Sequence, residues 1–405
     1  MLKINYPTQK NDIDAMHKRY LDCFPDKAGM QRRLNPVLSR MGLKRDKRFT
    51  IENILIAPIE ELLQICAVMK GKKWEKHLET IQRIFNYDKF ANEKKYQPVI
   101  ANFFMNTPEL NTTTCYFCNI DHIYSFKLID DFQNGLDLVT RGTAEDLVRI
   151  KGIGKAMAKK IKDQSKGISS LSDLKNIPAH LVTNIENLEV KERNNLFTLD
   201  HVLDKAANPV AALSLYNFVP CCYSCNSKFK RSQKLVNANP GISPTSKDFL
   251  FDKYVRFKLF YYRPEPAKTD KDDKKTSGNS GKQSKSKDKT STGSDNKSID
   301  INSVSDFVLN FEIDRDPVDY DNFLQIFRLR ARYNFHKKEI LELIRLKREY
   351  SDSQIDEIAR LTNRTSLEIK KTIFGKEIFE DTPNTKPLTK LKRDIALEIK
   401  ILNEM

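Results

Sequence analysis

The chain has 405 residues, 39% of them hydrophobic, a length that predicts two or three domains with their own cores. Lys and Arg total 70 against 54 Asp and Glu, and the formal net charge of +16 favours polyanionic partners without identifying one. No run of about 18 apolar residues is present, so we expect no membrane span. The first residues, Met1–Pro7, lack a signal-like apolar run, and we expect a cytoplasmic protein with reduced cysteines.

Residues 1–110 are predicted to form a helical N-terminal domain. Apolar residues recur there at helical spacing: Ile54, Leu55, Ile59, Leu62, Leu63, Trp74, Leu78, Ile81 and Ile84. His17 and His77 are far from other ligand residues, so we expect surface or half-buried histidines. Cys23 and Cys66 are solitary and are expected to be small core residues.

Two C-x-x-C pairs, Cys115/Cys118 and Cys222/Cys225, predict a metal site. A two-residue spacer lets both thiolates of a tight turn face one ion, and two such turns complete the tetrahedron that zinc favours. Four protein ligands leave no open position, so this Zn²⁺ is expected to be structural. Cys221 is an alternative to Cys222, although only Cys222 keeps the spacing, and His122 is a further alternative ligand.

Residues 143–162 predict two short helices joined by Gly152-Ile153-Gly154, the first capped by Thr143. This segment resembles the helix-hairpin-helix, a module that binds the DNA backbone without reading sequence. The resemblance implies phosphate contacts by Gly152 and Gly154, with charge added by Lys151, Lys155, Lys159 and Lys160. Residues 172–181 give a degenerate second copy without glycines, expected to be a packing partner. The alternative is an ordinary helical hairpin with a glycine turn.

The run Leu199-Asp200-His201-Val202, followed by Asn217 and by Cys225-Asn226, resembles the HNH nuclease motif in its zinc-containing form. McrA-type restriction enzymes and phage endonuclease VII junction resolvases share that form. The resemblance covers about fifty residues. It implies that His201 is the general base, that Asp200 and Asn226 hold one Mg²⁺ or Mn²⁺, and that Asn217 braces the loop and orients the histidine. These residue types suit phosphodiester hydrolysis, which needs a base for water and a cation on the phosphate oxygens.

Three basic residues, Lys228, Lys230 and Arg231, follow on the expected helix. They are predicted either to contact substrate phosphate or to form a solvated basic face. A second Asp-His pair, Asp121-His122, precedes Asn226 by 104 positions from its histidine, whereas His201 precedes it by 25. One hairpin and a helix start fit the shorter spacing, so His201 is preferred.

The 82 positions from Cys118 to Asp200 exceed the short connection of compact HNH proteins, which implies an insertion. We therefore expect a nuclease core within 111–235, made of residues 111–124 and 195–235, with a helix-hairpin-helix insertion at 125–194. Residues 246–315 are predicted to form a hairpin, because apolar side chains alternate along 255–261 and 307–313. A Lys- and Ser-rich loop, 267–302, is expected to be disordered. A linker between separate domains is the alternative.

Residues 318–405 are predicted to form a C-terminal helical domain. Ser353 and Asp356 resemble a capping box at the start of one helix, and Gly375 is expected to end a later one. The fold class is α+β and mostly helical, with a small zinc-stapled ββα-metal core, an inserted helix-hairpin-helix and helical flanks.

The function expected from these resemblances is metal-dependent cleavage of DNA, expected to be double-stranded, in anti-phage defence or restriction, with an ATPase as a possible protein partner. One alternative is a repair or junction-resolving nuclease. Another is a non-catalytic zinc module that binds nucleic acid.

Overall fold

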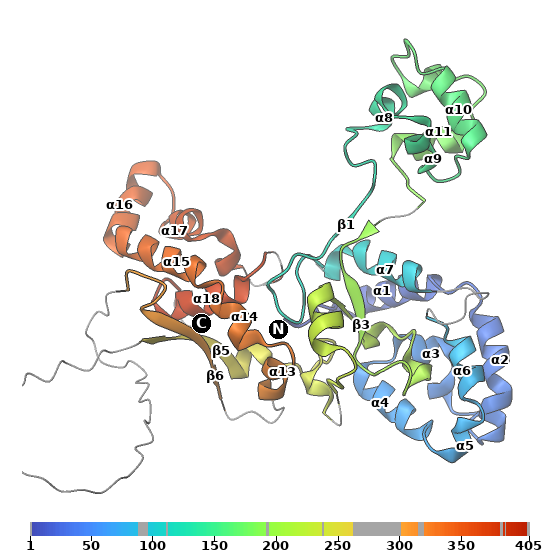
Figure 1. Ribbon diagram of the computed structural model, residues 1–405, viewed down its shortest axis with the longest axis horizontal. Coiled ribbons are helices and arrows are strands. Elements are labelled where there is room, and N and C mark those ends of the chain that lie inside the picture. The colour runs from blue at the N-terminus through green and yellow to red at the C-terminus, as the bar shows by residue number, and fades with distance from the viewer. Residues whose placement is uncertain are drawn as a thin grey trace, which may run out of the picture. The chain divides into compact units, whose positions relative to one another are not determined.

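The computed structural model describes residues 2–87, 96–110, 112–191, 194–236, 239–261, 301–314, 320–380, 384 and 386–402 (Figure 1). The chain divides into two compact units, residues 4–247 and residues 1–3 with 248–405. The class is α+β and helix-rich, and the described residues contain three two-stranded sheets. The loop expected at 267–302 lies outside the described residues except for its last two positions. No helix among the described residues combines the length and apolarity needed to cross a bilayer.

The N-terminal part of the first unit is helical, as its apolar spacing predicts. Its helices are α1 (Lys10–Asp22), α2 (Lys27–Arg40), α3 (Ile51–Ile56), α4 (Ile59–Val68), α5 (Lys72–Glu75), α6 (Leu78–Ile84) and α7 (Gln97–Met105). Helix α3 begins where the Thr50 side chain accepts a hydrogen bond from the Asn53 amide. Buried aromatic rings hold α1 against α7, with Tyr20 and Phe103 edge to face at 4.9 Å.

The hairpin of β3 (Thr198–His201) and β4 (Phe218–Cys221) belongs to the same unit as these helices. Two buried hydrogen bonds join the helices to the connection between the strands. The Tyr20 hydroxyl donates to the Leu213 carbonyl at 2.6 Å, and the Ser214 hydroxyl donates to the Ile54 carbonyl at 2.7 Å. The N-terminal helices therefore fix one side of the β3–β4 connection.

The insertion between the two cysteine pairs is a group of short helices with its own core (Figure 1). It contains α8 (Gly135–Arg141), α9 (Ala144–Val148), α10 (Lys155–Asp163), the 3-10 turn η3 (Leu171–Asp173) and α11 (Ala179–Glu186). Its two ends come together where β1 (Ser125–Phe126) pairs with β2 (Asn194–Asn195). Thr143 caps α9 as predicted and forms a capping box with Asp146.

The second unit is built on a longer hairpin, in which β5 (Val255–Tyr261) pairs antiparallel with β6 (Phe307–Ile313) along the full length of both strands. Its helices are α12 (Phe251–Tyr254), α13 (Tyr320–Ile326), α14 (Leu329–Asn334), α15 (Lys337–Glu349), α16 (Asp352–Thr362), α17 (Ser366–Phe374) and α18 (Thr389–Glu398). The alternating apolar side chains of both strands are buried against these helices, with the rings of Phe257 and Tyr333 4.4 Å apart.

Helix side chains satisfy backbone groups along both edges of this hairpin. On the β5 edge, the carboxylates of Asp394 and Glu398 accept from the amides of Phe257 and Leu259 at 2.9 and 3.1 Å. On the β6 edge, the Asn334 side-chain amide both accepts from the Leu309 amide and donates to its carbonyl. A two-stranded ribbon leaves both edges unpaired, so these contacts replace the missing neighbouring strands.

The capping prediction for α16 is wrong by two residues. The helix begins after Ser351, whose hydroxyl accepts from the Gln354 amide while the Gln354 side chain returns to Ser351. Glutamine completes the reciprocal bond pair over the usual spacing, which Ser353 and Asp356 do not achieve here. Helix α17 ends at Phe374, before Gly375 with a φ of 96°, as expected.

Because the Glu398 carboxyl is buried, we predict that the stability of the β5 edge depends on pH. Burial raises its pKa from 4.5 to about 7. The folded state then retains a proton that the unfolded chain has released, so the stabilisation from this group is fully present below pH 4.5 and is lost as the pH rises to about 7. We expect the free energy of opening of β5 to fall by about 2 kcal/mol over this window. Hydrogen exchange of the β5 amides measures it.

Glu398→Gln keeps an acceptor for the Leu259 amide and should flatten this pH dependence. Glu342→Gln, which changes a carboxylate in an exposed ion pair with Arg345, is the control and should retain it. An unchanged pH dependence in Glu398→Gln would contradict the assignment.

Candidate functional site

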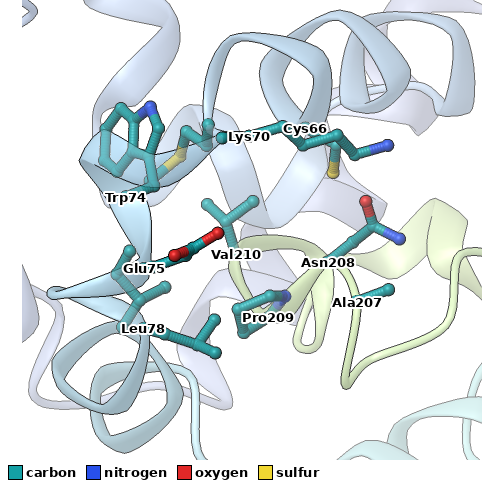
Figure 2. Close-up of a pocket in the computed structure, with 12 residues that line it drawn as sticks. Cys66, Lys70, Trp74, Glu75, Leu78, Ala207, Asn208, Pro209 and Val210 are labelled. Atoms are coloured by element: carbon teal, nitrogen blue, oxygen red, sulfur yellow. The ribbon is translucent and has the colours of Figure 1, made fainter.

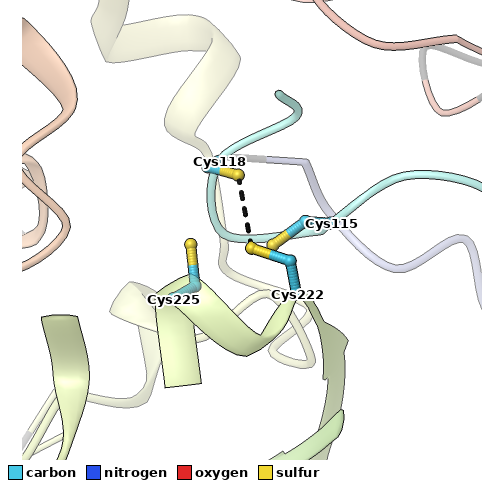
Figure 3. Close-up of side chains that lie close together, drawn as sticks. All are labelled: Cys115, Cys118, Cys222 and Cys225. Carbon is cyan, nitrogen blue, oxygen red and sulfur yellow. Dashed lines mark hydrogen bonds between the residues drawn. The ribbon is translucent and has the colours of Figure 1, made fainter. Parts of the chain in front are cut away.

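Four buried cysteines from two distant segments form one cluster. The Sγ atoms of Cys115, Cys118, Cys222 and Cys225 all lie within 4.8 Å of one another. Figure 3 shows the first pair on a turn and the second at the start of a helix. The Sγ atoms of Cys118 and Cys222 are 4.0 Å apart. A tetrahedral zinc site with bonds of ~2.3 Å places its sulfurs ~3.8 Å apart. The four side chains can therefore hold a structural zinc ion with small adjustments.

The adjacent Cys221 lies outside the cluster. Its thiol is buried against Thr198, with Sγ 3.4 Å from the hydroxyl oxygen, across the β3–β4 ladder. Neighbouring residues of a strand point to opposite faces, so Cys221 and Cys222 cannot serve the same ion from the end of β4. His122 is also outside, exposed on the turn that carries the first pair. The spacing argument for Cys222 thus agrees with the geometry.

The second cysteine pair leads directly into a π-helix, η6 (Ser224–Lys230), which packs on β3. Asn226 is half-buried on its first turn, next to Cys225. Lys228 is exposed on the same helix. A hairpin followed by a helix therefore carries Asp200, His201, Asn217 and Asn226, and the cysteine cluster lies where β4 passes into the helix.

Asp200 is buried and paired with a lysine. The residue is 4% exposed, and its Oδ1 accepts from the Lys230 ammonium at 2.9 Å. The other oxygen, Oδ2, has no hydrogen-bond partner among the described residues. Burial raises the pKa of Asp200 to about 6, against the attraction of Lys230. Because one of its buried oxygens has no hydrogen-bond partner among the described residues, this carboxylate is the group of the site best suited to bind a cation.

Of the two alternatives predicted for Lys230, the solvated basic face is wrong. The residue is 5% exposed, and its ammonium also donates to the His201 carbonyl at 3.2 Å. The reason is electrostatic: Asp200 lies 30 positions earlier in the chain, but β3 and η6 pack together and bring the two charges into contact. A buried lysine without a carboxylate partner is strongly disfavoured.

His201 points to the other face of the hairpin. Its ring, 9% exposed, lies between Tyr87 and Phe218 at centroid distances of 4.7 and 4.8 Å. Its Nε2 is 3.0 Å from the Ala212 carbonyl oxygen, which only accepts, so Nε2 carries the proton in a neutral ring. In that tautomer the second ring nitrogen, Nδ1, carries the lone pair.

Asn217 braces the loop that presents this carbonyl. Its side-chain oxygen accepts from the Leu203 amide at 2.7 Å, and its nitrogen donates to the carbonyls of Leu203 and Ala211. Three bonds from one buried amide close the loop from 203 to 211 immediately before Ala212. The position of the His201 acceptor therefore depends on Asn217.

No hydrogen bond among the described residues joins the side chains of Asp200, His201 and Asn226 to one another. The structure places Asp200 and Asn226 on facing elements, β3 and η6, and His201 on the opposite face of the same strand. Asp121-His122 is part of the first cysteine turn, where the Asp121 carbonyl accepts from the Cys115 amide. The sequence did not predict the contacts of His201 with Tyr87 and Ala212, because neither packing against an aromatic ring nor a hydrogen bond to a backbone carbonyl has a sequence motif.

The insertion presents Gly152-Ile153-Gly154 between α9 and α10. Gly152 has a φ of 82°, and a Cβ there would lie 2.6 Å from the Leu181 side chain, so the fold itself requires glycine. Gly154 has no such constraint: its φ is −91° and a Cβ would meet nothing within 4 Å. Lys151, Lys155 and Lys159 are exposed around this turn. Packing therefore does not explain the glycine at 154.

The second copy of the hairpin is more regular than its sequence indicates. Residues 174–179 repeat the order of 150–155, and Asn176, with a φ of 57°, takes the left-handed position of Gly152. Asparagine adopts this conformation more readily than most residues. The Lys160 ammonium donates to the Asn176 carbonyl at 2.8 Å, so this lysine links α10 to the second turn.

A separate cavity of about 150 Å³ lies between α4–α6 and the β3–β4 connection. Figure 2 shows Cys66, Trp74 and Leu78 facing Pro209 and Val210 across it. None of the expected hydrolytic residues lines this cavity, and its walls are mainly apolar. It is therefore not where phosphodiester chemistry would take place.

No protein-family model, curated protein or solved structure matches the chain.

The cysteine cluster predicts one tightly held zinc. Cys222→Ser should lose the metal and lower the free energy of unfolding by about 3 kcal/mol or more, because a buried ligand is removed. Zinc content by mass spectrometry and thermal melting measure both effects.

Cys221→Ser is the matched control, since it makes the same change one residue away and outside the cluster. It should keep about one zinc per chain and cost less than about 1 kcal/mol. Equal zinc loss in both variants would contradict the ligand assignment.

Proposed function

We propose that this chain is a metal-dependent DNA endonuclease of the HNH type, with a zinc-stapled ββα-metal core and an inserted helix-hairpin-helix. One observation carries the proposal: a hairpin and the helix after it hold Asp200, His201 and Asn226 beside a four-cysteine cluster. The order of the motif along this hairpin and helix supports the proposal, whereas the cluster alone would suit any zinc module.

Asp200 and Asn226 are the residues that would hold Mg²⁺ or Mn²⁺. The donor set fits a hard cation, because it offers a carboxylate with an unsatisfied buried oxygen and an amide carbonyl from the facing helix. When bound, such an ion supplies positive charge to the phosphate oxygens during hydrolysis. The adjacent Cys225 fixes the first turn of η6, and with it the position of Asn226.

His201 would act as the general base. The Ala212 carbonyl holds the proton on Nε2, so Nδ1 would be the ring nitrogen that takes a proton from the attacking water. Asn217 and the N-terminal helices keep that carbonyl in place. Asp200 and His201 lie on opposite faces of β3, so the base and the cation would approach the scissile phosphate from different sides.

The insertion would bind the DNA backbone. Packing does not explain why residue 154 is a glycine. A glycine at this position lets a phosphate approach the start of α10, and the exposed Lys155 and Lys159 add positive charge. The second hairpin, with Asn176 in the left-handed position, offers a similar backbone. Contacts of this kind hold a duplex without reading its sequence.

A second candidate function is a non-catalytic zinc module that binds nucleic acid. The ion pair of Asp200 with Lys230 and the low exposure of His201 favour it. The motif also resembles restriction, anti-phage and junction-resolving nucleases, so linear, supercoiled and branched DNA are all informative substrates. A protein partner such as an ATPase remains part of the proposed defence role.

Cleavage of DNA tests the proposal. With Mg²⁺ or Mn²⁺, the wild type should cleave, and His201→Ala should lose about a hundredfold or more in rate because the general base is gone. His122→Ala, which removes the exposed histidine of the other Asp-His pair, should cleave like the wild type. Gel analysis of single-turnover reactions gives the rates. Equal cleavage by the wild type and His201→Ala would remove the catalytic assignment.

DNA affinity tests the insertion separately. The double variant Lys155→Glu/Lys159→Glu should bind duplex DNA about tenfold or more weakly, and the slope of log affinity against log salt should shrink by about two. Fluorescence anisotropy without divalent cations measures both. Lys72→Glu/Lys76→Glu, the same charge change on exposed residues in α5 and directly after it, is the control. Equal losses in both double variants would show a general charge effect instead.

A further inference from the structure

Lys230 lies where a cation bound to Asp200 would compete with it. It is the last residue of η6, and its Nζ is 2.9 Å from Asp200 Oδ1 and 3.2 Å from the His201 carbonyl oxygen. The side chains of Lys230 and Asp200 are 7% and 5% exposed. Water therefore contributes little to either charge, and each depends on the other.

The pair leaves the carboxylate incompletely satisfied. Oδ1 accepts from the ammonium, whereas Oδ2 is buried with no hydrogen-bond partner in the described part of the chain. A buried carboxylate oxygen without a donor or cation is costly. Lys230 thus neutralises Asp200 without satisfying both of its oxygens.

The helix presents an amide and an ammonium together. Asn226 and Lys230 are four residues apart on η6, and residues at that separation lie on the same side of a helix. The helix packs on β3, and the Lys230 ammonium contacts Asp200 there. A divalent ion at the carboxylate would lie within a few ångströms of the ammonium, and the repulsion between them would be poorly screened at a buried position.

We infer that Lys230 is an internal counter-ion that closes the divalent-metal site: its ammonium occupies the Asp200 carboxylate when metal is absent and must leave it when Mg²⁺ or Mn²⁺ binds. The inference rests on the proposed role of Asp200 as a metal ligand. It assigns Lys230 a positioning and regulatory role that the HNH resemblance does not supply. The lysine stabilises the metal-free fold and lowers the affinity for metal, so the site fills only when the cation concentration is sufficient.

Mn²⁺ binding to the zinc-loaded chain tests this inference. Lys230→Met removes the ammonium and keeps most of the side-chain volume, so Mn²⁺ should bind about tenfold tighter than in the wild type. Without Mn²⁺ the variant should melt at a lower temperature, and saturating Mn²⁺ should raise its melting temperature more than that of the wild type. Lys228→Met makes the same change at an exposed position of η6 and should match the wild type in every measurement. Electron paramagnetic resonance of free Mn²⁺ gives the affinities.

The outcomes separate this inference from the proposed function. Suppose that the wild type binds Mn²⁺ and that Asp200→Asn abolishes this binding. Unchanged or weaker binding by Lys230→Met would then overturn the role of Lys230 and leave the metal site standing. If Asp200→Asn binds Mn²⁺ as the wild type does, both the role of Lys230 and the metal site are overturned. Both are also overturned if neither the wild type nor Lys230→Met binds Mn²⁺.

A measurement on the wild type covers the case in which Lys230→Met does not fold. Acylation of lysines, followed by peptide mass spectrometry, should find Lys230 protected without Mn²⁺ and more reactive with it, because the ammonium has left its buried partner. Lys228 should react equally in both conditions. Equal protection of Lys230 with and without saturating Mn²⁺ would overturn the inference.

Discussion

The burial of four cysteine sulfurs in one place is the constraint on which the rest of this unit depends. Cys118 and Cys222 are 104 positions apart, yet their Sγ atoms lie 4.0 Å from each other. Closing so long a loop has an entropic cost, which a zinc–thiolate site can offset because metal binding contributes folding free energy. Cys225 belongs to η6, so the cluster also fixes the helix that carries Asn226 and Lys230. The cysteine cluster, which lies beside the candidate site, therefore helps to position its residues.

A second support acts on His201 from the other face of the hairpin. The ring is held by Tyr87, Phe218 and the Ala212 carbonyl, and that carbonyl belongs to a loop fixed on two sides. Asn217 closes the loop from within, and Tyr20 holds the next carbonyl, that of Leu213, from α1. The N-terminal helices thus contribute to the geometry of the histidine although they carry no ligand of their own. A loosened α1 would be expected to misplace the imidazole of His201 without touching it.

The sequence predicted those features that depend on local spacing. Alternating apolar residues were enough for the strands 255–261 and 307–313, and the two-residue spacer distinguished Cys222 from Cys221. It failed where a contact joins distant segments or where one residue type replaces another. Lys230 resembles an exposed basic residue until β3 brings Asp200 to it. Asn176 adopts the left-handed conformation that a glycine was expected to supply, so the second hairpin looked degenerate in the sequence. The acceptor of His201 is a backbone carbonyl, which no residue pattern marks.

The most direct test of the metal-site geometry is anomalous scattering from crystals of the full chain soaked in Mn²⁺, with data on both sides of the zinc absorption edge. Two distinct sites are expected: zinc among Cys115, Cys118, Cys222 and Cys225, and manganese bound by Asp200 and Asn226, with the Lys230 ammonium withdrawn from the carboxylate. Manganese bound elsewhere, or a fully occupied Asp200–Lys230 pair at saturating Mn²⁺, would contradict the proposed centre.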